Sequence, residues 1–143
     1  MWTVCNPKNE GEMRECSMLG KSLSRLVQPT ILTVLAASDK PLHGYLIVKE
    51  AANAPTFGGK KPDATGVYRT LKLMEENGLV TSEWDMPKAG PAKRAFTLTD
   101  SGRATLRRWI DSLACYELTV EEVRKEAAAA LEIPLPNAPV CHD

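Results

Sequence analysis

The spacing of apolar residues changes at Gly78, and this change limits the fold more than any other feature of the sequence. Before it, Val67, Leu71 and Met74 recur at steps of four and three residues, which predicts one buried face of a helix. Asp63 is placed to cap the start of that helix through its carboxylate, and Gly78 is placed to end it in the left-handed conformation. We therefore expect a helix between Asp63 and Gly78.

After Gly78 the spacing becomes that of strands. Residues 79–84 and 93–98 are two predicted strands, and residues 85–91 between them form a turn that contains Pro and Gly. The pattern predicts a β-hairpin. Its returning strand is basic because it carries Lys93 and Arg94.

Two shorter helices are predicted before this unit. Gln28–Pro29 opens the first, since Pro is tolerated at the start of a helix, and the second begins around His43–Gly44. Three helices followed by a two-stranded hairpin is the element order of a winged helix-turn-helix. The expected fold class is therefore mainly α with a small β-hairpin wing (α+β).

A long amphipathic region follows the hairpin. Thr99 is a natural N-cap for a fourth helix, and residues 119–122 form a capping box at which a helix starts or resumes, until Pro134 stops it. One small winged domain cannot cover the apolar residues of this region, so we expect a twofold partner. The candidate dimerisation residues are Leu106, Trp109, Ile110, Leu113, Val123, Ala127 and Leu131.

These elements predict four parts of the chain. They are a flexible N-terminal arm (1–18), a winged helix-turn-helix DNA-binding domain (19–98) with a short helical segment at its start, C-terminal dimerisation helices (99–132) and a disordered tail (133–143).

The charge is zero overall but unevenly distributed, with 18 basic and 18 acidic residues in the whole chain. Residues 60–108 hold ten Lys or Arg against six acids, whereas residues 109–143 hold two against seven. Such a division lets a neutral protein present a positive face to a polyanion, although a mixed, solvated surface would give the same composition.

Several classes of function lack their sequence signals. The longest apolar stretch, residues 31–37, is too short to span a bilayer, and no basic head followed by an apolar run marks a secretory signal. We expect a cytoplasmic protein with no membrane partner. Motifs of hydrolases, zinc proteases and phosphate-binding loops are absent and the chain has two His, so we expect no catalytic residues and no enzyme activity.

The four cysteines, Cys5, Cys16, Cys115 and Cys141, are scattered without a Cys-x-x-Cys pair. A zinc site would have to combine distant segments such as Cys141–His142 and the N-terminal pair, whereas structural zinc sites usually contain close ligand pairs. Reduced, unligated thiols are the favoured interpretation, because the cytosol keeps thiols reduced. No metal and no cofactor are expected.

The candidate DNA-binding residues lie on the third helix and the wing. Arg69, Thr70 and Lys72 face away from the apolar stripe, and we expect two of them to contact bases or phosphates, with a solvated face as the alternative. Lys88 lies in the turn of the wing. Lys93 and Arg94 alternate across a strand and cannot face the same groove wall, so one of them is expected to pack or cap instead.

Five segments together resemble the PadR family of bacterial transcriptional regulators, over residues 29 to about 114. The His43-Gly44-Tyr45 turn and the wing sequence Gly-Pro-Ala-Lys-Arg at 90–94 are the most distinctive of them. The five segments are Lys40 to Tyr45, Val67-Tyr68 with Leu71-Lys72, Glu76 to Val80, Gly90 to Arg94, and Leu98 to Gly102.

The resemblance implies a homodimeric repressor whose C-terminal helices form the dimer interface. The ligand of such a repressor, where there is one, is often a small aromatic or hydrophobic compound. The resemblance also adds Thr65 at the start of the recognition helix, and Tyr68 as a phosphate contact, with a half-buried core tyrosine as the alternative. Family members often have a proline where this chain has Arg69, which makes Arg69 a candidate base reader.

The expected function is therefore that of a ligand-responsive repressor that binds double-stranded DNA at an inverted-repeat operator as a homodimer. Twofold symmetry places one recognition helix at each half-site. The alternative is a winged-helix protein-interaction or redox-sensing module that does not bind operator DNA.

Overall fold

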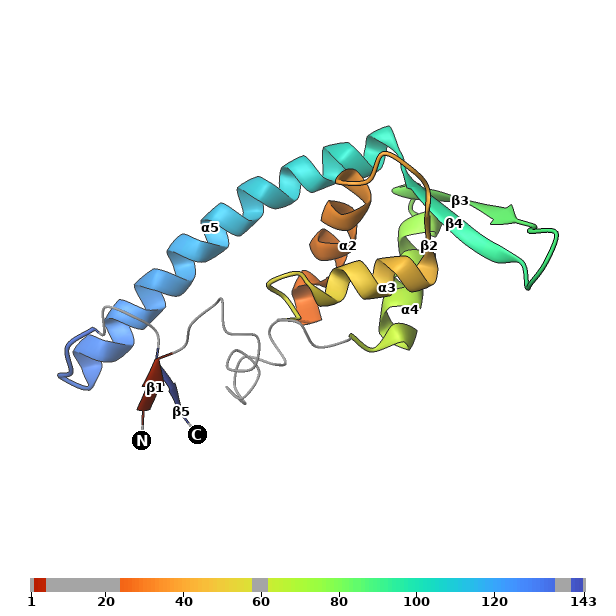
Figure 1. The fold of residues 1–143 in the computed structure, drawn as a ribbon. Coiled ribbons are helices and arrows are strands. Elements are labelled where there is room, and N and C mark those ends of the chain that lie inside the picture. Colours follow the sequence, from red (N-terminus) through yellow and green to blue (C-terminus); the bar gives the residue numbers. More distant parts are fainter. Residues whose placement is uncertain (1, 5–23, 58–61, 136–139, 143) are drawn as a thin grey trace.

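The structure, a computed structural model, describes residues 2–4, 24–57, 62–135 and 140–142 (Figure 1). Three short helices and a small sheet form a winged unit, and one long helix leads from it toward the chain termini. The helices are α2 (Val27–Ala36), α3 (Gly44–Ala52), α4 (Ala64–Glu76) and α5 (Asp100–Ala130), and the 3-10 turn η2 (Ser24–Leu26) leads directly into α2. The strands are β1 (Trp2–Val4), β2 (Leu42–His43), β3 (Val80–Asp85), β4 (Lys93–Leu98) and β5 (Val140–His142).

The boundaries of α4 follow from its local chemistry. The Asp63 carboxylate accepts hydrogen bonds from the backbone amides of Thr65 and Gly66, at 3.2 and 3.0 Å, and so satisfies two amides that have no partner within the helix. Gly78 follows the C-terminal end of the helix with a φ of 72°, a conformation that glycine adopts without strain. Both predictions from the sequence are confirmed.

The hydrophobic core lies where α2, α3 and α4 meet the sheet. Val67, Leu71 and Met74 of α4 are almost fully buried there, as their spacing predicts. The other residues with less than 2% exposure that fill this core are Ile31, Leu32, Ile47 and Val80. This packing fixes α4 with one face inward and leaves its opposite face to solvent.

The wing is part of a three-stranded antiparallel sheet in the order β2-β4-β3. Phe96 on the central strand β4 lies opposite Leu42 of β2 and Ser82 of β3. The sequence predicts the hairpin of β3 and β4 but misses β2, because a strand of two residues is too short to show alternation. Strand β2 holds the start of α3 against the wing.

The region after the wing is one helix of 31 residues, which corrects the prediction of separate C-terminal helices. Thr99 caps its start as predicted, because its hydroxyl oxygen accepts a hydrogen bond from the Gly102 amide at 3.0 Å. Thr119 does not begin a new helix. Its hydroxyl donates to the Cys115 carbonyl at 2.9 Å, one turn back, so the capping-box sequence at 119–122 lies inside a continuous helix.

The two ends of the chain also differ from the prediction of a flexible arm and a disordered tail. Strand β1 pairs antiparallel with β5, with Thr3 opposite Cys141. Each of these strands has three residues, too few for alternation to be recognised in the sequence, and a pairing between the two ends of the chain has no local signal. The rest of the arm, and residues 136–139 and 143 of the tail, lie outside the described residues.

Among the residues that the structure describes, no helix combines the length and the apolar character that a membrane span requires.

Candidate nucleic-acid interface

The outward face of α4 presents most of the residues that the sequence proposes for DNA contact. Thr65, Arg69 and Lys72 are exposed, and neither Arg69 nor Lys72 has an ion-pair partner among the described residues. Thr70 is only half-exposed, and its hydroxyl donates to the Gly66 carbonyl at 2.9 Å. The hydroxyl proton of Thr70 is therefore used inside the helix, and the two cations are the groups best placed for an anionic partner.

Tyr68 joins α4 to the start of α3. Its ring lies so close to Gly44 that a Cβ atom at position 44 would overlap it, yet 45% of the residue is exposed. The two interpretations that the sequence leaves open for Tyr68 are thus compatible in space. The ring packs within the helix-turn-helix and leaves nearly half of its surface free for contact.

The two neighbouring cations on β4 have separate surroundings, as strand alternation requires. The Lys93 ammonium lies 5.1 Å from the centre of the Tyr45 ring, on the side of the wing near the start of α3. Arg94 faces α4 instead. Lys88 is exposed in the turn that ends the wing, and among the described residues it has no ion-pair partner.

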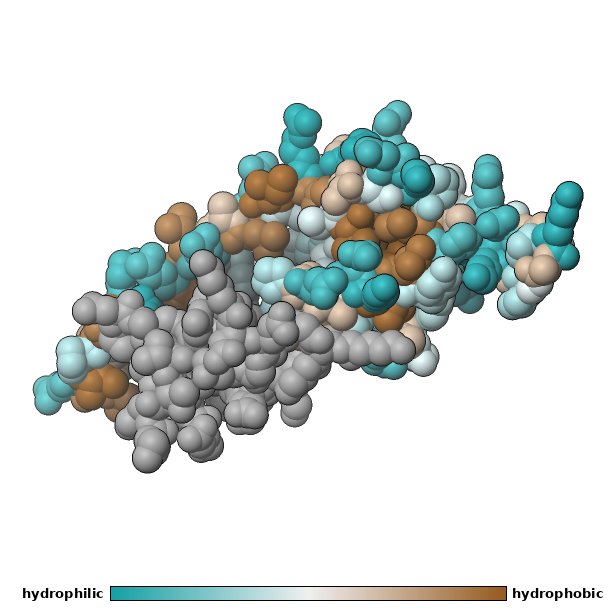
Figure 2. Space-filling model, viewed as in Figure 1, coloured by the Kyte–Doolittle hydropathy of each residue, from teal (hydrophilic) through white to brown (hydrophobic). Residues whose placement is uncertain are grey.

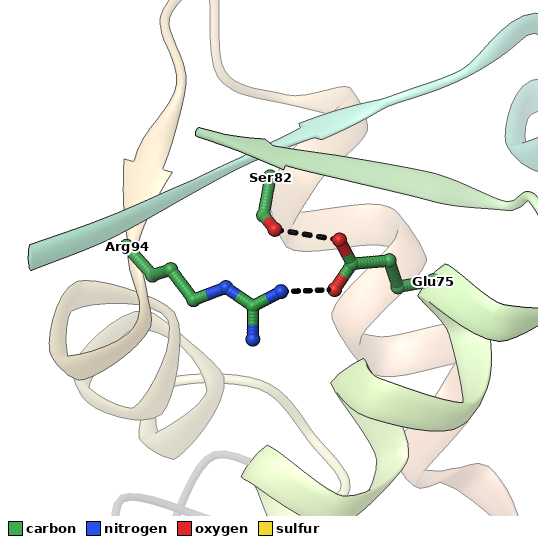
Figure 3. Close-up of polar contacts among 3 residues, drawn as sticks. All are labelled: Glu75, Ser82 and Arg94. Carbon is green, nitrogen blue, oxygen red and sulfur yellow. Dashed lines mark hydrogen bonds and ion pairs between the residues drawn. The ribbon is translucent and has the colours of Figure 1, made fainter. Parts of the chain in front are cut away.

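Arg94 takes part in a polar network that joins α4 to both strands of the wing (Figure 3). One guanidinium nitrogen donates to Glu75 Oε2 at 2.7 Å, and the Ser82 hydroxyl donates to Glu75 Oε1 at 2.6 Å. The guanidinium also lies 5.8 and 5.7 Å from the ring centres of Trp84 and Phe96. Glu75 is not among the predicted site residues, because a carboxylate 19 residues before its partner gives no pairing signal in the sequence.

A second contact holds the other side of the wing. His43 Nε2 and Asp85 Oδ2 are 3.1 Å apart, and the His43 ring stacks on Tyr45 with 8° between the ring planes. His43 and Asp85 come from β2 and from the end of β3. The His-Gly-Tyr turn therefore helps to orient the wing.

A hollow of about 410 Å³ separates α4 from β4. Hydrophilic side chains gather over the wing on the face seen in Figure 2, whereas hydrophobic ones lie along α5 and over the helices of the winged unit. The residues lining the hollow are Tyr68, Lys72, Glu75, Glu76, Arg94 and Phe96. The candidate interface thus consists of the outward face of α4, the hollow beside it and the hairpin of the wing. Its exposed cations include Arg69 and Lys72 on the helix and Lys88 at the turn of the hairpin.

The candidate dimerisation residues divide into two groups along α5. Leu106 and Trp109 pack against the core of their own winged unit, and Trp109 Nε1 donates to the Gln28 side-chain oxygen at 2.9 Å. The first turns of α5 thus belong to the winged unit, although the sequence assigns both residues to the dimer. Leu113 is half-buried beside α2 and α3.

The remaining candidates on α5 lack cover within the chain. Ile110, Val123 and Leu131 are 62, 60 and 70% exposed, and Ala127 is exposed as well. Tyr116, Leu118 and Val120 add further exposed apolar surface that the sequence prediction did not include. Far from the winged unit, α5 thus exposes several apolar side chains, although Ala128 is buried.

The described part of the chain contains no group of three or more His, Cys, Asp or Glu side chains arranged to hold a metal ion. Cys115 is exposed on α5 with a free thiol. Cys5 and Cys16 lie outside the described residues.

A sequence model of the family "Transcriptional regulator PadR-like family" matches residues 31–108, more than half of the chain. A Mycobacterium tuberculosis protein named "Probable transcriptional regulator Rv1176c" is 43% identical over 44 residues. That match covers 31% of this chain and 23% of the other protein, so this chain spans about a quarter of its length.

Solved structures have the same fold. A PadR family transcriptional regulator from Eggerthella lenta is 24% identical with a TM-score of 0.62, over 75% of this chain and 88% of that one. Bacillus subtilis PadR, solved in complex with operator DNA, is 26% identical with a TM-score of 0.51, over 60% of this chain and 47% of that one.

Proposed function

The chain belongs to the PadR-like family of transcriptional regulators, and we propose that it acts as a homodimeric repressor that binds an inverted-repeat operator in DNA. The observation that carries the proposal is the outward face of α4. Arg69 and Lys72 extend from it without ion-pair partners among the described residues, beside a wing that carries Lys88 at its turn.

The dimensions of α4 suit the major groove. A helix of 13 residues is about 20 Å long, and the groove, about 12 Å wide, admits an α-helix. With α4 in the groove, a hairpin next to it reaches the adjacent backbone, where cations neutralise phosphates. Bacillus subtilis PadR, whose fold this chain shares, was solved with operator DNA.

The second half of α5 supports the dimer. Leu113, Tyr116, Val120, Val123 and Ala127 follow one another at alternating steps of three and four residues, the spacing of a coiled-coil seam. Leu113 packs near the winged unit, but Tyr116, Val120 and Val123 remain 52, 47 and 60% exposed. A second copy of α5 presents the same stripe and can cover it by twofold symmetry.

A groove between α2, α3 and α5 is the place we propose for a small aromatic or hydrophobic effector. Its volume is about 640 Å³, within the range of small-molecule sites. Pro29, Val34 and Leu46 line it, together with Leu113 of α5, so that a bound compound touches both the winged unit and the dimerisation helix.

The effector proposal is tested by thermal shift with a panel of small aromatic compounds. A compound that raises the melting temperature of the natural chain should have no effect on Thr33→Trp, which fills the groove. It should still stabilise Thr81→Trp, which places the same ring on the exposed outer side of β3. Equal shifts for both variants would place the compound elsewhere.

The repressor proposal is tested by selecting duplexes from a randomised library and measuring affinity for the selected sequence by fluorescence anisotropy. An inverted repeat bound by a dimer is the expected result. If no duplex is enriched and binding stays weaker than about millimolar at low salt, below ordinary non-specific binding, the protein-interaction alternative replaces this proposal.

A further inference from the structure

We propose that Arg94 is a positioning residue, which fixes the angle between the recognition helix and the wing through Glu75 and does not itself contact DNA. The inference rests on the proposed function. It assigns Arg94 a role different from those of Arg69, Lys72 and Lys88, which remain the candidates for direct contact.

The geometry joins three elements at one carboxylate (Figure 3). Glu75 lies in the last turn of α4, Ser82 lies on β3 and Arg94 on β4. One carboxylate oxygen accepts from Ser82 at 2.6 Å and the other from Arg94 at 2.7 Å, so the recognition helix is tied to both strands of the wing. Both distances are those of strong, charge-assisted hydrogen bonds.

The network lies at the point along the wing where burial of the hairpin ends, and this position lets it fix the direction of the wing relative to α4. Phe96, with 3% exposure, is the last buried residue on β4 toward the turn, whereas Trp84 on β3 is already 64% exposed. Beyond Phe96 no residue of the hairpin is buried, so its direction depends on side-chain contacts: the Glu75–Arg94 pair on the side of α4, and His43–Asp85 on the side of β2. The Glu75–Arg94 pair lies at this boundary, where a fixed contact has the greatest effect on where the turn of the wing points.

The surroundings of Arg94 also disfavour a phosphate contact. Its guanidinium charge is compensated by Glu75, and the rings of Trp84 and Phe96 lie on it. Moving Arg94 to a phosphate would take away the ion-pair partner of Glu75 and leave its carboxylate with the Ser82 hydrogen bond, beside the helix proposed to enter the DNA groove. An uncompensated carboxylate there would repel the phosphates, so the paired arrangement favours DNA binding.

The test compares Glu75→Gln, Arg94→Gln and the exchanged pair Glu75→Arg with Arg94→Glu, and uses Lys88→Gln as the control for a phosphate contact. Each full-length variant is titrated against the selected operator and a scrambled duplex at several salt concentrations. A positioning role predicts that both single variants lose about tenfold in operator affinity, the equivalent of one misplaced base contact, and change little on scrambled DNA. The exchanged pair should recover most of the loss, because it restores the ion pair in reverse.

A phosphate contact predicts the opposite pattern. Glu75→Gln would then release Arg94 and tighten binding to both duplexes, and Arg94→Gln would behave like Lys88→Gln, with weaker binding to both duplexes and a smaller salt slope. Either result, or an exchanged pair no better than the single variants at an unchanged melting temperature, overturns the inference. If a single variant does not fold, Ser82→Ala takes its place with the same expected loss of selectivity. Failure of the natural chain to bind any duplex would overturn the proposed function instead.

Discussion

Gly44 and Tyr68 determine how closely the two helices of the helix-turn-helix approach each other. A methyl group at position 44 would overlap the Tyr68 ring, so either the ring or α3 has to move. We expect Gly44→Ala to lower the free energy of unfolding by about 1–3 kcal/mol, the usual cost of overpacking. Urea denaturation measures this change.

The matching control removes the ring. In a Tyr68→Ala background, Gly44→Ala should cost much less, because the space is then open. An equal cost in both backgrounds would show that the contact between Gly44 and Tyr68 does not limit the approach of the helices.

Asp63 stabilises the start of α4 by accepting two amide hydrogen bonds. Asp63→Ala should therefore reduce the free energy of unfolding by about 1 kcal/mol, whereas Asp63→Asn, which keeps an accepting oxygen, should lose less. Equilibrium unfolding of the two variants provides the comparison. A larger loss for Asn than for Ala would contradict the capping role.

Arg69 and Lys88 are expected to affect DNA binding differently. If Arg69 reads a base edge, Arg69→Ala should cost about 1–3 kcal/mol on the operator and little on scrambled DNA. Lys88→Ala should weaken binding to both duplexes and reduce the salt slope, because a phosphate contact carries no sequence information. Anisotropy titrations of both variants against both duplexes would reveal whether the two profiles differ as expected.

The ends of the helices are predicted well from the sequence, because they depend on neighbouring residues. The cap at Asp63, the left-handed Gly78 and the cap at Thr99 each act within a few residues of their own position, and all three are found. The capping box at 119–122 is equally local, but residues 103–118 before it contain no proline or glycine that would end the helix. Helix α5 therefore continues through the capping box.

Contacts between distant segments could not be predicted from the sequence. Strand β2 forms because β4 is beside it, and two residues carry no period of their own. The exposed cations of α4 follow from its apolar stripe, but the network of Glu75 and Arg94 depends on the crossing of a helix and a hairpin. Which of Lys93 and Arg94 faces α4 depends on the same crossing, so the sequence alone could not decide between them.

The exposed stripe of α5 leads to a prediction about assembly. Val123→Asp should make the protein monomeric at micromolar concentration, since it places a charge in the exposed seam that we propose a second copy of α5 covers. Leu118→Asp is the matched control, because Leu118 is also exposed, at 64%, but lies off the seam. Light scattering of the two variants and the natural chain gives the molar masses.

A natural chain that is monomeric at micromolar concentration would disprove the proposal that α5 forms the dimer interface. Equal effects of the two substitutions would also disprove it, since only the face of α5 that carries Val123 should contact the second subunit.

At the scale of the whole molecule, the uneven charge separates two roles along the chain. Arg69 and Lys72 on α4 and Lys88 on the wing have no ion-pair partner among the described residues, whereas the second half of α5 has more acidic than basic residues. There, the Lys125 ammonium lies 3.1 Å from a Glu122 oxygen and 3.6 Å from a Glu121 oxygen. The hydrogen bond that Lys125 donates to Glu122 is the largest cause of the raised pKa of Lys125. The dimerisation that we propose at this end would leave the cations of α4 and the wing of each subunit available to DNA.

We propose that two subunits bind one inverted repeat through α4 and the wing. Lys72, Lys88 and Lys93, all exposed, supply about three phosphate-neutralising groups per subunit, so a dimer releases counterions from about six phosphates and log affinity should fall against log salt with a slope near −5. The most direct measurement is an anisotropy titration of the natural chain against the selected duplex and against one half-site at several salt concentrations. We expect one dimer per inverted repeat, that slope, and a large loss of affinity on the half-site. Equal affinity for the half-site and the full repeat, or binding that does not respond to salt, would contradict it.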